Sequence, residues 1–257
     1  MTSVEAVSLV SKLVSISVLV QSFELMSLRK EFRENGLYPW SILKAEYSRG
    51  LQPLFSLFFS ARNFPFLILA QLILALVLFI LPVFWICVGL MITALFINLR
   101  FRGTFNGGSD KMTLMSLIAL VIATSHDNSV FSVIVGMWFL ALQSVTSYLF
   151  AGFAKLREPT WRSGSVLFQL LNLPHYPVPQ MIRKRVMKNP EWMKIIPWAL
   201  LGFECLFPLI FLNSFVAMIF FSAALIFHLM NVCIFGLNRF FFAWVATYPA
   251  IFFLIQK

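Results

Sequence analysis

Long apolar segments separated by short polar ones dominate the chain. A helix needs about 20 apolar residues to cross the hydrocarbon core of a bilayer. We predict a membrane-spanning helix at eight places, at residues 5–25, 64–82, 83–99, 112–125, 130–152, 195–212, 215–236 and 239–255. The apolar residues in these segments run continuously, whereas barrel strands alternate apolar and polar positions. The pattern therefore predicts an all-α, polytopic helical membrane protein with about eight spans, formed as a single transmembrane domain over residues 1–257.

The composition excludes a soluble protein. Of the 257 residues, 60% are hydrophobic and 30 are phenylalanine, while only 12% are charged. Soluble domains have about 25% charged residues. A compact domain of this length could not remove so much apolar surface from water.

The basic residues indicate an orientation. The net charge is +10, which in a soluble protein would suggest a nucleic-acid partner, but in a membrane protein reflects topology. If the eight spans alternate, every Lys and Arg except Lys12 and Lys257 falls on one face. The positive-inside rule makes that face cytoplasmic and places both termini outside. We therefore expect an integral protein, in a bacterial inner membrane, with cytoplasmic basic loops and no nucleic-acid partner.

Two long loops contain helical patterns of their own. Residues 51–59 form an apolar run too short to span and predict a helix in the membrane interface. Residues 161–173 look amphipathic, and the run RKRVMK at 183–188 is strongly basic. That run either contacts anionic lipid head groups or serves only as an orientation signal.

Three ionisable residues in or beside spans are the candidate catalytic groups, because burying a charge in a bilayer is costly. Lys155 ends the fifth span beside small residues such as Gly152, which let helices approach closely. It is either a snorkelling lysine or a base in an apolar pocket. His228 lies two turns inside the seventh span, with Asn231 on the same face, and is either a packing group or a proton carrier. Glu204 lies mid-span and needs a partner, for which Lys155 and His228 are the candidates.

A short glycine-containing segment lies between the third and fourth spans. In residues 106–110, Gly107 and Gly108 permit close backbone approach, so the N–H groups could hold an anion. Asp110 alternatively caps the fourth helix. The three cysteines stand far apart, and no metal-binding, hydrolase or dinucleotide motif is present. We therefore predict no metal.

Two segments carry a family resemblance. YLFAGFAKLREPTWRSG at 148–164 resembles the tyrosine–AG–x–x–K–L…W–x–x–G segment of the vitamin K-dependent gamma-carboxylase and the wider HTTM (horizontally transferred transmembrane) family. IFHLMNVCIFGLNRFFFAWVATYPAIFF at 226–253 resembles the F-H-x-M-N segment of that family and the following span. Glu204 falls where the carboxylase has an acidic residue. The resemblance covers about residues 95–255.

The resemblance implies a chemistry. The lysine of the carboxylase segment is regarded as the base that deprotonates vitamin K hydroquinone, and it corresponds to Lys155. The histidine of F-H-x-M-N corresponds to His228, and a second carboxylase histidine corresponds to the region of Asp110 and Lys111. The implied cofactor is a reduced, vitamin K-like quinone. The carboxylase acts on the lumenal face of its membrane, whereas the basic residues place Lys155 on the cytoplasmic face.

Three functions remain open at the level of sequence. The first is an enzyme with a quinone-like or lipid cofactor, with peptide modification as one such activity. The second is a non-enzymatic accessory protein for export, maturation or immunity of a secreted peptide, and the third a transporter or quinone-reducing subunit. The expected partners are membrane lipid and a small peptide substrate or a partner membrane protein. The candidate catalytic residues are Lys155, His228 and Glu204, and the candidate cofactor-binding residues are Trp161, Asn231, Asp110, Lys111, Gly107 and Gly108.

Overall fold

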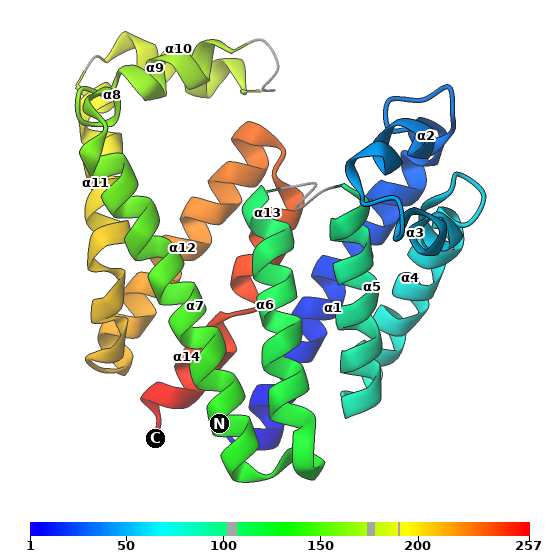
Figure 1. The fold of residues 1–257 in the computed structure, drawn as a ribbon. Coiled ribbons are helices and arrows are strands. Elements are labelled where there is room, and N and C mark those ends of the chain that lie inside the picture. Colours follow the sequence, from blue (N-terminus) through cyan, green and yellow to red (C-terminus); the bar gives the residue numbers. More distant parts are fainter. Residues whose placement is uncertain (102–106, 174–177, 190) are drawn as a thin grey trace. The chain divides into compact units, whose positions relative to one another are not determined.

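The computed structural model confirms that the protein is an all-α helical membrane protein (Figure 1). It describes residues 1–101, 107–173, 178–189 and 191–257, and within them the backbone but not the side chains of residues 127 and 128. These residues contain helices and no β-strand. The chain divides into two compact units, Met1–Met137 and Trp138–Lys257.

A helix lies at each of the eight places where a span was predicted. Among the described residues, five helical segments are long and apolar enough to cross a membrane. A sixth arises if α3 (Gln52–Phe59) and α4 (Phe64–Ile80), bent by 65° at their junction, form one span. The number of eight spans therefore stays a prediction. The five segments are α1 (Ser3–Ser27), α7 (Val130–Arg157), Trp192–Phe211, α12 (Ser214–Phe235) and Asn238–Ile255.

The first unit contains α1 and the helices that pack around it. The apolar run at 51–59 is helical, as predicted, and joins α4 at the 65° bend. The remaining elements are η1 (Arg29–Phe32), α2 (Trp40–Leu43), η2 (Lys44–Glu46), α3 (Gln52–Phe59), α4 (Phe64–Ile80), α5 (Phe84–Arg100), α6 (Gly107–Thr124) and η3 (Ser125–Asn128), followed by the first turns of α7.

The serines of α1 explain how this polar helix can be a span candidate. The hydroxyls of Ser15 and Ser22 donate hydrogen bonds to carbonyls four residues earlier in the same helix, at 2.7 and 2.9 Å. Each hydroxyl is thereby satisfied without another helix, which is what apolar surroundings require. The helix begins at a capping box, in which Thr2 and Glu5 bond each other's backbone N–H groups.

Arg100 fixes the 38–59 loop to the end of α5. Its guanidinium is fully buried and donates to the carbonyls of Phe59 and Tyr38, at 3.1 and 2.8 Å. Aromatic rings surround it at 5.1–5.9 Å, which offsets part of the cost of burying the charge. Nearby, the hydroxyl of Tyr47 donates to the carbonyl of Leu99, and burial raises the pKa of that tyrosine. Arg100 is therefore an anchor of the fold.

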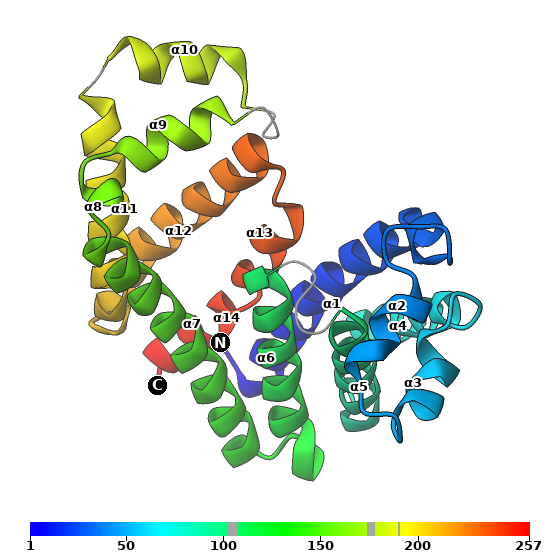
Figure 2. The same ribbon diagram turned by 45° about the horizontal axis from the view of Figure 1, so that its top comes forward.

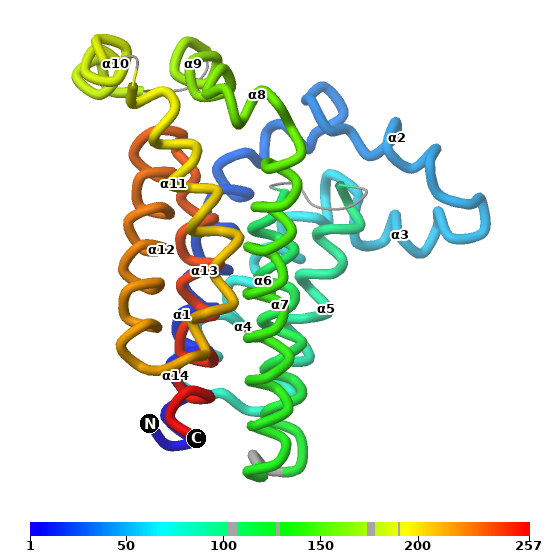
Figure 3. Tube along the Cα trace, turned by 90° about the vertical axis from the view of Figure 1, so that its left-hand side faces the viewer, coloured from blue at the N-terminus to red at the C-terminus, as the bar shows by residue number. Residues whose placement is uncertain are grey.

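The second unit combines long helices with two short ones that lie across their ends. Figures 1 and 3 both show α9 (Ser165–Asn172) and α10 (Gln180–Lys188) running across the ends of α7, α11 (Trp192–Leu206) and α12. Figure 2 shows α9 and α10 obliquely from above. Both segments that looked amphipathic or basic in the sequence are thus helical. Besides α12 and the remainder of α7, the elements are α8 (Pro159–Arg162), α9 (Ser165–Asn172), α10 (Gln180–Lys188), α11 (Trp192–Leu206), η4 (Phe207–Phe211), α13 (Asn238–Val245) and α14 (Tyr248–Ile255).

Two glycines set the close packing of this unit. A Cβ atom on Gly152 of α7 would lie 2.8 Å from Cys205 Sγ and 3.0 Å from Glu204 Cβ of α11. This confirms that small residues bring another helix close to α7. Gly164, with φ +80°, lies against the carbonyl of Met193, where a Cβ atom would be only 1.8 Å from the oxygen. Pro197 cannot donate to that carbonyl as a normal helical residue would, so the turn before α9 packs directly on α11.

Candidate functional site

The second unit contains an apolar pocket beneath α9 and α10. Its volume is about 510 Å³, within the range of ligand pockets. Aliphatic side chains of α9, α10 and α11 form one part of the wall, and the last turns of α12 form the other. The polar side chains in the lining are Lys155, Asn231 and the indole of Trp161. Such a pocket suits an apolar molecule that has one polar end.

Lys155 and Glu204 form an ion pair at this pocket. Lys155 Nζ donates to both carboxylate oxygens of Glu204 at 2.6 Å. The Lys155 side chain is 20% exposed and lines the pocket, whereas the Glu204 side chain is 3% exposed and is not part of the lining. The close approach at Gly152 holds Glu204 against α7. The sequence left two partners open for Glu204, and the structure pairs it with Lys155.

Two predicted cofactor-binding residues stand beside this pair. The ring centre of Trp161 lies 5.4 Å from Lys155 Nζ, within range of a cation–π interaction. Asn231 lines the same pocket and donates from Nδ2 to the carbonyl of Phe227 at 2.9 Å. The structure therefore brings Lys155, Trp161 and Asn231 to one pocket, with Glu204 behind Lys155.

His228 has a different partner from the one considered in the sequence. It is fully buried, and its Nε2 lies 2.5 Å from the hydroxyl of Tyr148, which in turn lies 3.3 Å from the hydroxyl of Tyr248. His228 is not among the residues that line the pocket. Its Nδ1 has no hydrogen-bond partner among the described residues. Aromatic rings, including those of Phe240 and Trp244 at 5.0 and 5.6 Å, enclose the imidazole.

Sequence reasoning missed Tyr148 and Tyr248. Tyr148 precedes Lys155 by seven residues, which is two helical turns, so both side chains lie on one face of α7. That spacing was the signal available for Tyr148. It places Tyr148, which contacts His228, on the same face of α7 as Lys155, which contacts Glu204. Tyr248 begins α14 after a break in the last span, which the apolar pattern does not reveal.

Replacing Tyr148 by phenylalanine should lower the free energy of unfolding by about 1–2 kcal/mol, because His228 Nε2 is left buried without a partner. Equilibrium unfolding in mixed detergent micelles measures this. Tyr248→Phe is the matched control, since it leaves the Tyr148–His228 contact intact and should cost less. Equal losses in the two variants would contradict the importance of that contact.

The remaining predicted residues belong to the first unit. Gly107 and Gly108 are the first residues of α6, and Lys111 is exposed on it. Asp110 is the fourth residue of α6 and so lies within the helix. Its side chain is buried and accepts a hydrogen bond from Gln21 Nε2 at 2.9 Å, and Gln21 in turn accepts one from Gln71 at 2.8 Å. This buried aspartate therefore takes part in a polar contact between α1 and α6 inside the first unit. Residue 106 lies outside the described part of the chain.

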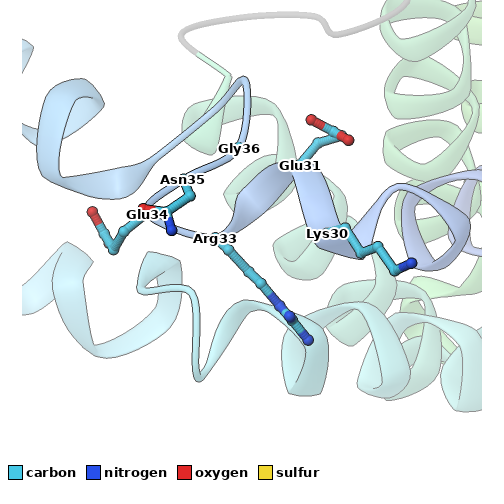
Figure 4. A pocket seen from close by; sticks show the side chains of 6 residues that line it. All are labelled: Lys30, Glu31, Arg33, Glu34, Asn35 and Gly36. Carbon is cyan, nitrogen blue, oxygen red and sulfur yellow. The ribbon is translucent and has the colours of Figure 1, made fainter.

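The first unit has a surface depression whose side chains do not point toward a common centre. It measures about 370 Å³ and is lined by Lys30, Glu31, Arg33, Glu34, Asn35 and Gly36. Figure 4 shows these side chains pointing in different directions. Glu31 accepts backbone bonds in the turn before Tyr38. The depression is therefore the surface of a turn.

Comparisons of the chain with protein-family models, curated proteins and solved structures gave no match. In the described part of the chain, no three His, Cys, Asp or Glu side chains group as a metal site requires. The second unit offers the chemistry of a lysine–carboxylate pair at an apolar pocket.

Proposed function

We propose that the protein is a membrane enzyme, similar to the vitamin K-dependent gamma-carboxylase and the HTTM family, that binds a reduced quinone or quinone-like lipid and accepts a proton from it. One observation carries this proposal: Lys155 Nζ lies at an apolar pocket while Glu204 holds it from behind at 2.6 Å. The resemblance of residues 148–164 to the carboxylase lysine segment supports the same assignment.

The pocket fits such a ligand. A flat ring could stack near Trp161, and the aliphatic walls and Phe227 could receive an isoprenoid tail. Lys155 and Asn231 are the polar groups that would orient the ring oxygens. A reduced quinone, when bound, supplies electrons for reaction with dioxygen and a weakly acidic ring hydroxyl.

The pair can accept a proton without leaving a charge unbalanced. Lys155 Nζ first transfers a proton to a carboxylate oxygen of Glu204, to which it is already hydrogen-bonded. The neutral amine then accepts a proton from a hydroxyl facing it in the pocket. The pair has gained one proton, and the resulting ammonium stays beside the new anion. Lys155 is therefore the group that touches the ligand, and Glu204 is where the net proton is held.

We also propose a membrane, an orientation and a substrate class for the protein. We place the protein in a bacterial inner membrane, and the sorting of the basic residues supports an orientation with the Lys155 end of α7 on the cytoplasmic side. The substrate class proposed through the resemblance is a peptide to be modified.

Binding of a reduced quinone tests the proposal. The hydroquinone of a naphthoquinone with one isoprenoid unit is titrated into the purified protein, and binding is followed by thermal shift. Two variants should weaken binding at least about tenfold, the loss expected for one charged hydrogen-bond partner or a filled pocket. One is the double variant Lys155→Met/Glu204→Leu, which leaves no unpaired charge, and the other is Leu200→Trp, which fills the pocket while keeping the pair.

Lys194→Met is the matched control, because Lys194 is an exposed lysine on α11, the helix that carries Glu204. It should bind as the wild type does. If all four proteins bind the hydroquinone equally, or if none binds it, the proposal is wrong.

A further inference from the structure

The helix α10 has two chemically different faces. Ile182 and Val186, four residues apart, line the apolar pocket, whereas Lys184 and Lys188 are exposed and lie on the opposite side by helical spacing. The nine residues of α10 include four basic side chains and no acidic one. The apolar face of α10 forms part of the pocket wall. The four basic side chains on the same helix have no role in that wall and need another explanation.

Another depression, in the second unit, lies on the outer side of the pocket wall that Ile182 and Val186 form. It measures about 420 Å³ and is lined by Ile182, Arg185, Val186, Asn189, Trp192 and Ile196. Ile182, Val186 and Ile196 also line the apolar pocket, so these three side chains separate the two spaces. Arg185 is the charged group of the outer depression. The nearest acidic residue along the chain is Glu191, which is exposed.

The residues of the depression are those expected at the depth of lipid head groups. Trp192 is the first residue of the candidate span Trp192–Phe211, and this residue is 49% exposed. Tryptophan is enriched where a span meets the membrane surface. Figure 3 shows α10 lying across the ends of the long helices of the unit, as an interfacial helix does.

We propose that the depression at Arg185 binds the phosphate head group of an anionic lipid of the surrounding membrane. A guanidinium offers two parallel N–H donors, which match the oxygens of a phosphate. Trp192 also lines the depression, and its indole N–H can donate to the same head group. Asn189 gives the rim its shape, since its Nδ2 donates to the carbonyl of Arg185 at 3.1 Å.

The bound lipid also holds α10 in place as a wall of the apolar pocket. Because Ile182 and Val186 face the pocket, a lipid attached to Arg185, which lies next to Val186 and three residues after Ile182, restrains both. The lipid site does not depend on what the pocket binds, so its test is independent of the quinone proposal.

Lipid titration by native mass spectrometry of the delipidated full-length protein tests the inference. Phosphatidylglycerol and phosphatidylcholine are compared on the wild type, Arg185→Gln and Lys184→Gln. The two variants lose the same charge from neighbouring positions of α10, but only Arg185 lines the depression. We expect Arg185→Gln to weaken phosphatidylglycerol binding about tenfold, and Lys184→Gln to change it less than about twofold.

Three results would overturn the inference. Equal effects of the two substitutions would mean that positive charge acts without a site. Equal binding of both lipids by the wild type would mean that no anionic head group is selected. If inorganic phosphate at matched concentration displaces the lipid completely, the site binds free phosphate. Amide hydrogen exchange of residues 180–189 in nanodiscs supplies a second readout, which phosphatidylglycerol should slow in the wild type and not in Arg185→Gln.

Discussion

Replacing Glu204 by leucine should lower the free energy of unfolding by about 3 kcal/mol, because removing one member of a buried ion pair leaves the other charge uncompensated. The effect should lie at the lower end of the usual range, since 20% of the Lys155 side chain is exposed and its ammonium can move toward the interface. Equilibrium unfolding in mixed micelles of dodecylmaltoside and sodium dodecyl sulfate measures the loss.

The double variant Lys155→Met/Glu204→Leu separates the pair from the packing around it. Apolar residues of similar volume often replace a buried pair without loss, so this protein should regain most of the stability that Glu204→Leu loses. It should nevertheless lack hydroquinone binding if the proposed function holds. A double variant as unstable as the single one would show that packing at position 204, and not the charge pair, sustains the fold.

Gly152→Ala should destabilise the second unit by about 2 kcal/mol, although alanine favours a helix over glycine by about 1 kcal/mol. The added methyl group would lie 2.8 Å from Cys205 Sγ and 2.9 Å from the backbone nitrogen of Cys205, so α7 and α11 would have to move apart. That movement also draws Glu204 away from Lys155. The variant should therefore lose both stability and hydroquinone binding.

Gly202→Ala is the control with the opposite expected sign. Gly202 lies on α11, two residues before Glu204, and a Cβ atom there would meet nothing within 4 Å. The substitution should stabilise the protein by up to about 1 kcal/mol through helix propensity alone. If both alanine variants shift stability in the same direction, the close approach of the two helices at Gly152 is not what limits substitution.

Apolar length predicts where the helices lie along the chain but not which side of each faces inward. A helix lies at all eight predicted places, because a helix satisfies the backbone hydrogen bonds of an apolar segment within that segment. A helix that is apolar all round, such as α12, has no polar stripe to show its orientation. The depth of His228 could therefore be predicted, but its direction toward Tyr148 could not. The break at Ala246 and Thr247 was also missed, although Pro249 in the first turn of α14 was a signal for it, because proline cannot donate the backbone hydrogen bond that a continuous helix would need there.

The residues of the candidate site also differ in whether the sequence could reveal their contacts. Lys155 and Glu204 could be singled out because each is costly in a bilayer, and a limited set of partners remained. Asp110 was equally conspicuous, but a glutamine on α1 satisfies it, and an uncharged partner leaves little trace in the sequence. Arg100 was counted only as a topological charge, since its two carbonyl acceptors lie in a loop some 40 to 60 residues earlier.

The two members of the ion pair enter the membrane at different times during synthesis. They lie 49 residues apart, which at typical rates of translation is a delay of about 2–10 s. Lys155 is made first and stands at the end of its helix, where a long side chain can keep its ammonium at the membrane surface during that interval. Glu204 follows in the middle of its own helix, where its side chain is too short to place the carboxylate at the membrane surface. The order of the two residues along the chain means that the carboxylate always arrives at a bilayer that already holds its cation.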